Sequence, residues 1–264
     1  MNRFQEARRV VVKVGTTTLT HGCGLLNYRR LESLVRTLAD LKNSGKEVVL
    51  VSSGAIAVGT GVLGLSVRPS DMPTKQACAA IGQCELMYTY DKLFSEYNHS
   101  VAQILLTRDD VEQAQRRQNA ANTFARLLEF GIIPIVNEND TVSTEEIEIG
   151  DNDTLSAIVA TLIDADLLVL LSDIDGLYTA NPKEDPSATL IPLVENVDDV
   201  RHLAGGSSSM FGKGGMVTKI HAADIACGTG IDMSIINGSN PALLYDLFDG
   251  KPMGTYFLGR KPHV

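Results

Sequence analysis

The sequence predicts an α/β protein whose central sheet is mostly parallel. Six short apolar runs alternate with segments of helical periodicity, and each run stops at small or polar residues. The chain has 264 residues, of which 44% are hydrophobic and 21% are charged, so it can bury a substantial core. Right-handed crossovers place the carboxyl ends of parallel strands on one edge of a sheet. Because ligands bind at that edge, the residues there are the first candidates for a functional site.

The six strands are expected over residues 10–14, 48–51, 100–106, 132–136, 167–171 and 231–236. Continuous apolar runs of this length are typical of strands that are buried on both faces of a sheet. Small or polar residues follow these strands, at Gly15, Ser53, Thr107, Asn137, Ser172 and Asn237. We expect all six residues to line one crevice.

The intervening helices are expected over residues 27–45, 55–64, 74–97, 119–130, 153–164 and 216–227. Asn27 suits the N-cap of the first helix, in which leucines recur at helical spacing until Gly45. Gly59, Gly61 and Gly64 in the second helix formally match the dinucleotide-binding pattern GxGxxG. That pattern must fill the turn between a strand and a helix, which these glycines do not. We therefore interpret them as positions of close helix packing.

Two polar clusters dominate the middle of the chain. The first, Asn-Glu-Asn-Asp at residues 137–140, directly follows a buried strand, and the second is Gly-Asp-Asn-Asp at residues 150–153. Polar groups at the carboxyl end of a buried strand indicate a binding crevice. The simpler alternatives are a solvated loop for the first cluster and a helix N-cap for the second. The glutamate-rich residues between them are expected to form an exposed loop, a hairpin or a lid.

Positive charge enters this acidic chain at a few informative places. Lys13 lies within the first apolar strand, where it is costly to bury unless it is paired; a position at the sheet edge is the alternative. Residues 212–219 combine glycines, lysines and a helix start, which suits a phosphate group, although they lack Walker A spacing. The alternative is a flexible surface connection, and the Gly/Ser-rich segment 204–215 should be mobile. Lys13 and Lys219 together would suit phosphoryl transfer.

Composition excludes several classes of protein. The formal net charge of -9 argues against general nucleic-acid binding, which needs a basic surface. No apolar run approaches about 18 residues and no leader is evident, so we expect a soluble, cytoplasmic protein without membrane association. The cysteines form no CxxC pair and no metal-ligand spacing with the histidines, which predicts reduced thiols and no dedicated metal site. They are Cys23, Cys78, Cys84 and Cys227.

Several motifs resemble those of the glutamate 5-kinase family, a branch of the amino acid kinases. They occupy residues 11–15, 51–56, 75–83, 135–142, 150–153, 170–178 and 214–219. The likeness runs in order from about residue 9 to about residue 257. It implies the amino acid kinase fold, a three-layer α/β/α sandwich with a mostly parallel central sheet. It also implies that ATP, with Mg²⁺ on the nucleotide, phosphorylates the side-chain carboxylate of L-glutamate to L-glutamyl 5-phosphate, the first step of proline biosynthesis.

The resemblance also implies roles for individual residues. Lys13 and Lys219 match the lysines that stabilise the transferring phosphoryl group, and Asp153 matches the catalytic acid that holds them in place. The glutamate-binding positions would be Ser53, Asp140 and Asn152. The nucleotide-binding positions would be Lys13, Ser172, Asp173, Lys213, Gly214, Gly215, Met216, Val217, Thr218 and Lys219.

The same likeness implies one amino acid kinase domain over residues 1–264, with the amino acid bound by about residues 1–160 and the nucleotide by about residues 161–264. Many relatives carry a C-terminal PUA domain that this chain lacks, so no RNA binding is expected. Family members are usually homo-oligomers inhibited by proline, and glutamyl phosphate reductase is an expected partner because acyl phosphates hydrolyse and cyclise. Three departures from the family pattern occur, at residues 16–18, Ile149 and Lys213.

Two other functions remain open at this stage. The first is a related small-molecule kinase acting on acetylglutamate, aspartate, carbamate or UMP. Asp140 argues against most of these, because a free amino group needs a carboxylate partner and an acylated amine or a phosphate does not. The second is a sensor that binds a nucleotide or an amino acid without turnover. Retention of Lys13, Asp153 and Lys219 argues against it, because binding alone needs no charge stabilisation at the reacting group.

Overall fold

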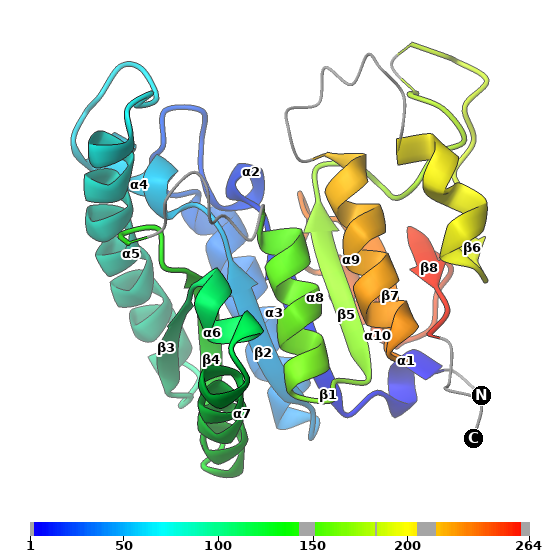
Figure 1. Cartoon of the computed structure of the whole chain (residues 1–264), viewed down its shortest axis with the longest axis horizontal. Coiled ribbons are helices and arrows are strands. Elements are labelled where there is room, and N and C mark those ends of the chain that lie inside the picture. Colours follow the sequence, from blue (N-terminus) through cyan, green and yellow to red (C-terminus); the bar gives the residue numbers. More distant parts are fainter. Residues whose placement is uncertain (1–2, 143–150, 183, 205–214, 260–264) are drawn as a thin grey trace.

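The computed structural model describes residues 3–142, 151–182, 184–204 and 215–259, and its centre is an eight-stranded sheet (Figure 1). The strands are β1 (Arg9–Val14), β2 (Glu47–Ser52), β3 (Val101–Leu106), β4 (Ile133–Glu138), β5 (Leu167–Ser172), β6 (Leu193–Val194), β7 (Asp232–Asn237) and β8 (Thr255–Phe257). Their order across the sheet is β3-β4-β2-β1-β5-β7-β8-β6. Neighbouring strands are parallel except β7 and β8, so the expected mostly parallel sheet is confirmed.

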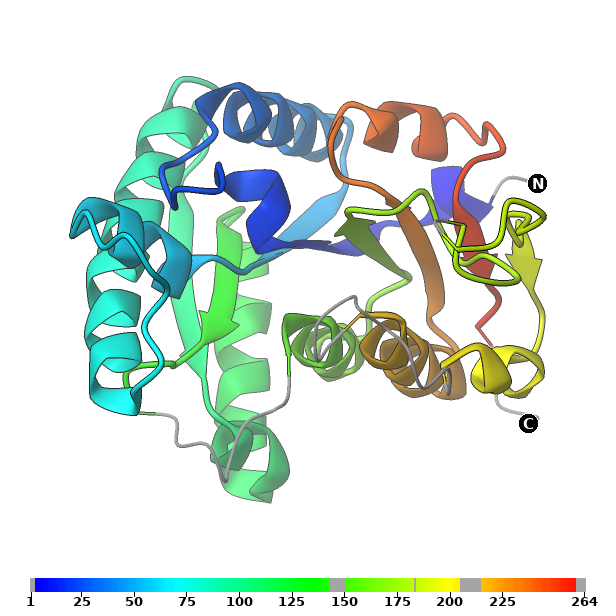
Figure 2. The same ribbon diagram turned by 90° about the horizontal axis from the view of Figure 1, so that it is seen from above.

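Helices cover both faces of this sheet. They are α1 (Arg3–Glu6), α2 (Thr16–Leu19), α3 (Tyr28–Asn43), α4 (Ala55–Val62), α5 (Met72–Ser95), α6 (Arg108–Glu112), α7 (Ala114–Glu129), α8 (Asn152–Leu162), η1 (Val197–Ala204), α9 (Met216–Gly228) and α10 (Leu243–Phe248). Figure 2 shows α3 and α10 on one side of the sheet and α7, α8 and α9 on the other. The three-layer α/β/α arrangement is therefore confirmed. Among the helices that the structure describes, none combines the length and hydrophobicity needed to cross a bilayer.

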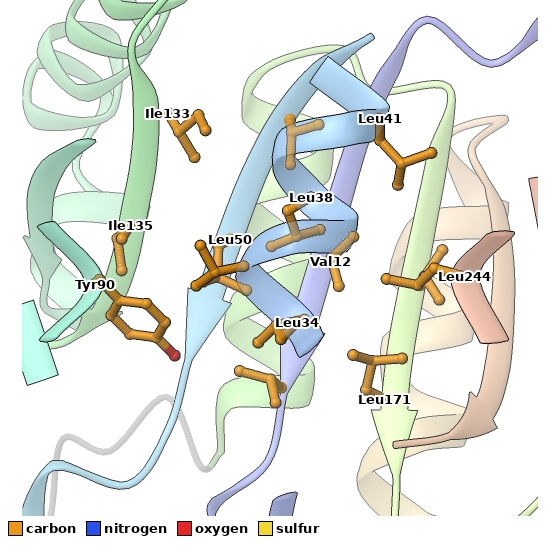
Figure 3. Close-up of a cluster of buried hydrophobic side chains, with 14 of the residues drawn as sticks. Val12, Leu34, Leu38, Leu41, Leu50, Tyr90, Ile133, Ile135, Leu171 and Leu244 are labelled. Atoms are coloured by element: carbon orange, nitrogen blue, oxygen red, sulfur yellow. The ribbon is translucent and has the colours of Figure 1, made fainter. Parts of the chain in front are cut away.

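The central strands send alternate side chains into two separate cores. Val12 and Val14 of β1 belong to the core beneath α3, α5 and α10, which Figure 3 shows around Val12 and Leu38. Val11 belongs to the opposite core, with side chains of α7, α8 and α9. Lys13 has the same parity as Val11, so it points toward the face that α8 covers. Because β1 lies between β2 and β5, the alternative that Lys13 is a sheet-edge lysine is wrong.

Glycines allow α4 and α5 to pack in direct backbone contact. A Cβ atom added to Gly59 would lie 1.9 Å from the carbonyl oxygen of Cys78, and one added to Gly82 would lie 1.8 Å from that of Ala55. Both distances are impossible for real atoms, so no larger residue fits without moving a helix. This confirms close helix packing for Gly59 and contradicts it for Gly64, whose added Cβ would meet nothing within 4 Å. Gly54 ends the turn before α4 with a φ of 104°, a left-handed conformation that favours glycine.

The structure differs from the expected elements mainly in short pieces. The helix expected to start at residue 119 begins at Ala114. The sequence did not indicate this earlier start, because several polar residues precede the one fully buried side chain of the helix, Phe124. Elements too short for a periodic signal were not expected from the sequence, namely α1, α2, α6, β6, η1, α10 and β8. The expectations for most of the loop 140–150 and of the segment 204–215, including Ile149 and Lys213, lie outside the described residues.

Candidate functional site

Two lysines from distant parts of the chain meet at one carboxylate. Lys13, near the end of β1, places its Nζ 2.6 Å from Oδ1 of Asp153, in the first turn of α8. Lys219, in the first turn of α9, places its Nζ 3.0 Å from Oδ2 of the same residue. The side chains are 12%, 4% and 11% exposed for Lys13, Asp153 and Lys219. These three residues form a nearly buried cluster with two cations and one anion.

The electrostatics of this cluster favour an ionised carboxylate. Burial alone would raise the pKa of Asp153, but the positive charges of Lys13 and Lys219 and their hydrogen bonds outweigh it, so the pKa lies below its ordinary value. Thr218 Oγ1 also donates to Oδ2 of Asp153, at 3.1 Å. Asp153 is therefore an acceptor held between donors, which suits it to orient lysines and not to take up a proton.

The neighbouring acid, Asp151, plays a different part. Its Oδ1 accepts a hydrogen bond from the backbone N–H of Thr154 at 2.8 Å, so Asp151 is the N-cap of α8. The N-cap alternative for this cluster is thus correct for Asp151 and wrong for Asp153. The first residues of α8 combine a structural cap with a side chain that binds both lysines.

A second group of side chains forms a continuous chain of hydrogen bonds beside the lysine cluster. Asn152 Nδ2 donates to Ser53 Oγ at 2.8 Å and to Asn137 Oδ1 at 2.8 Å. Asn137 Nδ2 in turn donates to Oε1 of Gln83 at 3.0 Å. Asn137 and Gln83 are buried, at 3% and 9% exposure. The solvated-loop alternative is therefore wrong for Asn137, which links β4 to both α5 and α8.

The direction of every bond in this chain follows from one backbone group. The N–H of Glu138 donates to Asn137 Oδ1 at 2.9 Å, and a backbone N–H can only donate. The other end of the Asn137 amide must then be its NH₂, which requires an oxygen from Gln83. Asn152 must likewise present its NH₂ to Asn137 and Ser53. Its own Oδ1 remains as an acceptor, and the Ser53 hydroxyl remains able to donate its proton.

Ser53, Asn152 and Asp140 share one cavity of about 480 Å³ at the carboxyl edge of the sheet. The start of α4, residues 54–57, lines it together with Asn137, Glu138 and Asp151. Of the six strand-end residues expected to share a crevice, Ser53 and Asn137 line this cavity, and the other four do not. They are Gly15, Thr107, Ser172 and Asn237. The expectation of a single crevice was therefore too broad for the described part of the chain.

The expected nucleotide residues occupy the other half of the same sheet edge. Ser172 ends β5, and its hydroxyl donates to Asp173 at 3.2 Å, while its carbonyl accepts the N–H of Gly238 at 2.6 Å. Ser172 is buried and Asp173 is exposed. Gly215 is the N-cap of α9, and the residues after it, Met216, Val217 and Thr218, form its first turn with Lys219. Lys213 and Gly214 lie outside the described residues.

Some residues of this site were not expected from the sequence. Gln83 and Arg68 were assigned no role from the sequence, because one is a polar residue within a long helix and the other lies in a loop between α4 and α5. Asn137 was noticed as a strand-end residue without an assigned role. Among the described residues, no group of three or more histidine, cysteine or acidic side chains could hold a metal ion.

The arrangement can neutralise and position a phosphoryl group. Phosphoryl transfer needs in-line placement and positive charge at the transferring group more than covalent chemistry. Lys13 and Lys219 provide the charge, and the cavity next to Asn152 provides space for an acceptor. The N-terminus of α9 adds N–H groups and a favourable dipole for an anion.

Comparisons with known proteins agree with this geometry. The model of the amino acid kinase family matches residues 8–237. A glutamate 5-kinase from Clostridium perfringens is 51% identical over 263 residues, covering 98% of each chain. One from Clostridium acetobutylicum is 54% identical over 256 residues, covering 97% of this chain and 96% of the relative.

Solved structures agree at the level of the fold. Carbamate kinase from Giardia lamblia matches with a TM-score of 0.68 at 19% identity, covering 97% of this chain and all of the other (100%). UMP kinase from Bacillus anthracis matches with a TM-score of 0.65 at 16% identity, covering 96% of each chain. The matched region, the degree of identity and the shared fold all point the same way: this chain belongs to the amino acid kinase family, in its glutamate 5-kinase branch.

Proposed function

We propose that this protein transfers the γ-phosphoryl group of MgATP to the side-chain carboxylate of L-glutamate, giving ADP and L-glutamyl 5-phosphate, the first step of proline biosynthesis. The observation that carries the proposal is the pairing of Lys13 and Lys219 on Asp153. Relatives that are 51% and 54% identical over nearly the whole chain bear the name glutamate 5-kinase, which supports the choice of acceptor.

In this reaction an oxygen of the substrate carboxylate attacks the γ-phosphorus. A new O–P bond forms while the bond between the γ-phosphorus and the β,γ-bridging oxygen breaks. The carboxylate is already ionised at neutral pH, so no general base is needed. Lys13 and Lys219 would neutralise the charge on the transferring group, and Asp153 would hold both ammonium groups in place. The lowered pKa of Asp153 agrees with this orienting role.

The substrate would lie in the cavity that Ser53, Asp140 and Asn152 line. The Ser53 N–H binds the carbonyl of Val14 at 3.1 Å, so Ser53 lies beside the end of β1, just past Lys13. The free hydrogen of its hydroxyl and the first N–H groups of α4 suit the acceptor carboxylate. Asp140 suits the substrate ammonium group, and Asn152 Oδ1 can accept from the same group.

The nucleotide would lie over the second half of the sheet edge. Ser172, Asp173 and the α9 N-terminus support this, together with Lys213 and Gly214 of the preceding segment. The division of the domain into an amino-acid side (about residues 1–160) and a nucleotide side (about 161–264) follows from it. Mg²⁺ enters as part of the MgATP substrate. It favours substrate phosphates, water and one or two carboxylates over an all-protein cage.

The test of the proposal is hydroxamate formation in the presence of hydroxylamine, which traps acyl phosphates. L-Glutamate, aspartate and N-acetyl-L-glutamate should be compared with MgATP, and ADP release should be measured with UMP and carbamate. Hydroxamate from L-glutamate alone is the expected result. A preference for another acceptor would identify a related small-molecule kinase. ATP binding without any acceptor turnover would instead identify a sensor.

Three further properties belong to the same proposal. Proline would compete for the amino-acid site, which a proline titration of the hydroxamate assay tests. The enzyme would be a cytoplasmic homo-oligomer, which light scattering of the purified protein tests. A reductase would take up the labile acyl phosphate, and repeated failure to co-purify the two enzymes with substrates present would count against such a complex.

A further inference from the structure

One cationic side chain, Arg68, lines the proposed substrate cavity and takes no part in the phosphoryl transfer proposed above. Arg68 lies in the loop between α4 and α5, which rises above the carboxyl edge of the sheet in Figure 1, and it lines the same cavity as Ser53 and Asn152. It is exposed, and within the described part of the chain it has no hydrogen bond or ion pair. An arginine with its full donor set available therefore lies at the cavity wall.

The charge of the cavity makes this arginine significant. The other charged side chains that line the cavity are acidic, namely Glu138, Asp140 and Asp151, and Arg68 is the one cation among the described lining residues. An amino-acid substrate with two carboxylates carries a net negative charge. Without a cation, the carboxylate that does not react would face like charges at close range.

We propose that Arg68 binds the α-carboxylate of the substrate and so selects amino acids whose α-carboxylate is free. The assignment rests on the proposed function. One carboxylate must reach Lys13 and Lys219 to be phosphorylated, and the ammonium group is matched by Asp140. The α-carboxylate is then the remaining charged group of the substrate, and Arg68 is the cation among the described residues that line the cavity. The planar guanidinium can bind a carboxylate through two parallel N–H···O bonds, which a lysine cannot.

The test compares L-glutamate with L-isoglutamine, its α-amide, which keeps the γ-carboxylate and the ammonium group and loses the α-carboxylate charge. Three proteins are measured: the wild type, Arg68→Met and Arg68→Lys. Calorimetry gives Kd for both ligands, and hydroxamate formation gives kcat and KM. Arg126→Met is the matched control, because Arg126 is an exposed arginine on α7, ion-paired with Glu129 and outside the cavity lining.

The wild type is expected to bind L-glutamate more tightly than L-isoglutamine. Arg68→Met should weaken the binding of L-glutamate roughly 10- to 100-fold and leave the Kd for L-isoglutamine nearly unchanged. The preference should therefore fall at least about tenfold, with KM for ATP unaffected. Arg68→Lys should be intermediate, because it keeps the charge and loses the paired geometry. Arg126→Met should behave as the wild type.

Several results would overturn the assignment. Equal binding of both ligands by the wild type would show that the α-carboxylate is not recognised. An equal loss of affinity for both ligands in Arg68→Met would show that Arg68 only supports the structure of the loop. If the wild type forms hydroxamate from L-glutamate and Arg68→Met keeps the full preference, the inference fails and the proposed function stands. If the wild type forms no hydroxamate from L-glutamate, the proposed function itself fails.

Discussion

The Nζ of Lys13 and Oδ1 of Asp153 lie 2.6 Å apart, although the two residues are far apart in the sequence. Lys13 belongs to β1, the first strand, and Asp153 lies in the first turn of α8, in the second half of the chain. The parallel sheet explains this proximity. β1 lies at the centre of the sheet, and α8 covers the face toward which Lys13 points. A lysine that would be costly to bury alone is thus stable because the fold delivers an acid to the same place.

Lys219→Ala should lower kcat roughly 10²-fold or more, with a smaller effect on KM for L-glutamate. The reason is that one preorganised positive group is lost where charge develops in the transition state. Steady-state hydroxamate kinetics measure the effect. Lys251→Ala is the control, since Lys251 pairs with Asp246 at an exposed site away from the cluster. Unchanged turnover in Lys219→Ala would remove this lysine from the mechanism.

Asp153→Asn should destabilise the protein by about 3–5 kcal/mol at neutral pH, because it leaves two nearly buried lysines without their anion. The folded-state pKa of Asp153 is lowered, so its contribution to the free energy of unfolding is complete above the ordinary pKa of about 3.9 and is lost as the pH falls through the lowered value. The difference between the two proteins should shrink in acid. Denaturant titrations at several pH values test this, and a difference independent of pH would contradict it.

The sequence predicted the large elements because their residues carry a periodic signal. The valine run of β1 and the leucine stripe of α3, capped by Asn27, are examples, and the cap is present as a 3.2 Å bond from the N–H of Arg30. The paired strand β8 has three residues, too few for any periodic signal, and exists because β7 and β6 lie on either side of it. Such elements depend on tertiary contacts that no local pattern encodes.

The site was predictable to a similar degree. Lys13, Asp153 and Lys219 could be found because the motifs that contain them resemble a known family, and Ser53 and Asn137 because they follow strands. Gln83 lies in one of these motifs, at residues 75–83, but the motif indicated no role for it. Its importance lies in the direction of a hydrogen bond to Asn137, which depends on the N–H of Glu138 and therefore on the three-dimensional arrangement.

Gln83→Met should raise KM for L-glutamate about tenfold with little change in KM for ATP. The substitution keeps the length of the side chain and removes the oxygen that accepts from Asn137. The buried Asn137 NH₂ then has no acceptor in Gln83, so Asn137 holds Asn152 less firmly, although the N–H of Glu138 still donates to Asn137 Oδ1. Gln83→Glu keeps an acceptor and should retain most of the affinity. Gln118→Met, at an exposed position of α7, is the control. Equal effects of Met and Glu at position 83 would refute this positioning role.

Gly82→Ala should destabilise the protein by about 1–3 kcal/mol, even though alanine is the better helix former by about 1 kcal/mol. The added Cβ would lie 1.8 Å from the carbonyl of Ala55, and α4 and α5 would have to separate. Gly228→Ala is the matched control, because nothing lies within 4 Å of its added Cβ. Thermal unfolding of both variants tests the prediction. A loss of equal size at both positions would mean that the contact between the helices is not the cause.

Asp140→Asn should weaken the binding of L-glutamate roughly 10- to 100-fold and leave the binding of N-acetyl-L-glutamate nearly unaffected. The substitution removes the negative charge that faces the substrate ammonium group in the proposed complex, and the acetylated amine has no charge to lose. The preference for the free amino acid should therefore fall. Binding of both ligands can be measured by calorimetry, with Asp109→Asn as control, because Asp109 is an exposed acid of α6 that does not line the cavity. If both ligands lose affinity to the same extent, Asp140 shapes the cavity and does not recognise the amine. If only the affinity for L-glutamate falls, the Asp140 carboxylate recognises the free amino group and so distinguishes a kinase for free amino acids from a kinase for their acylated forms.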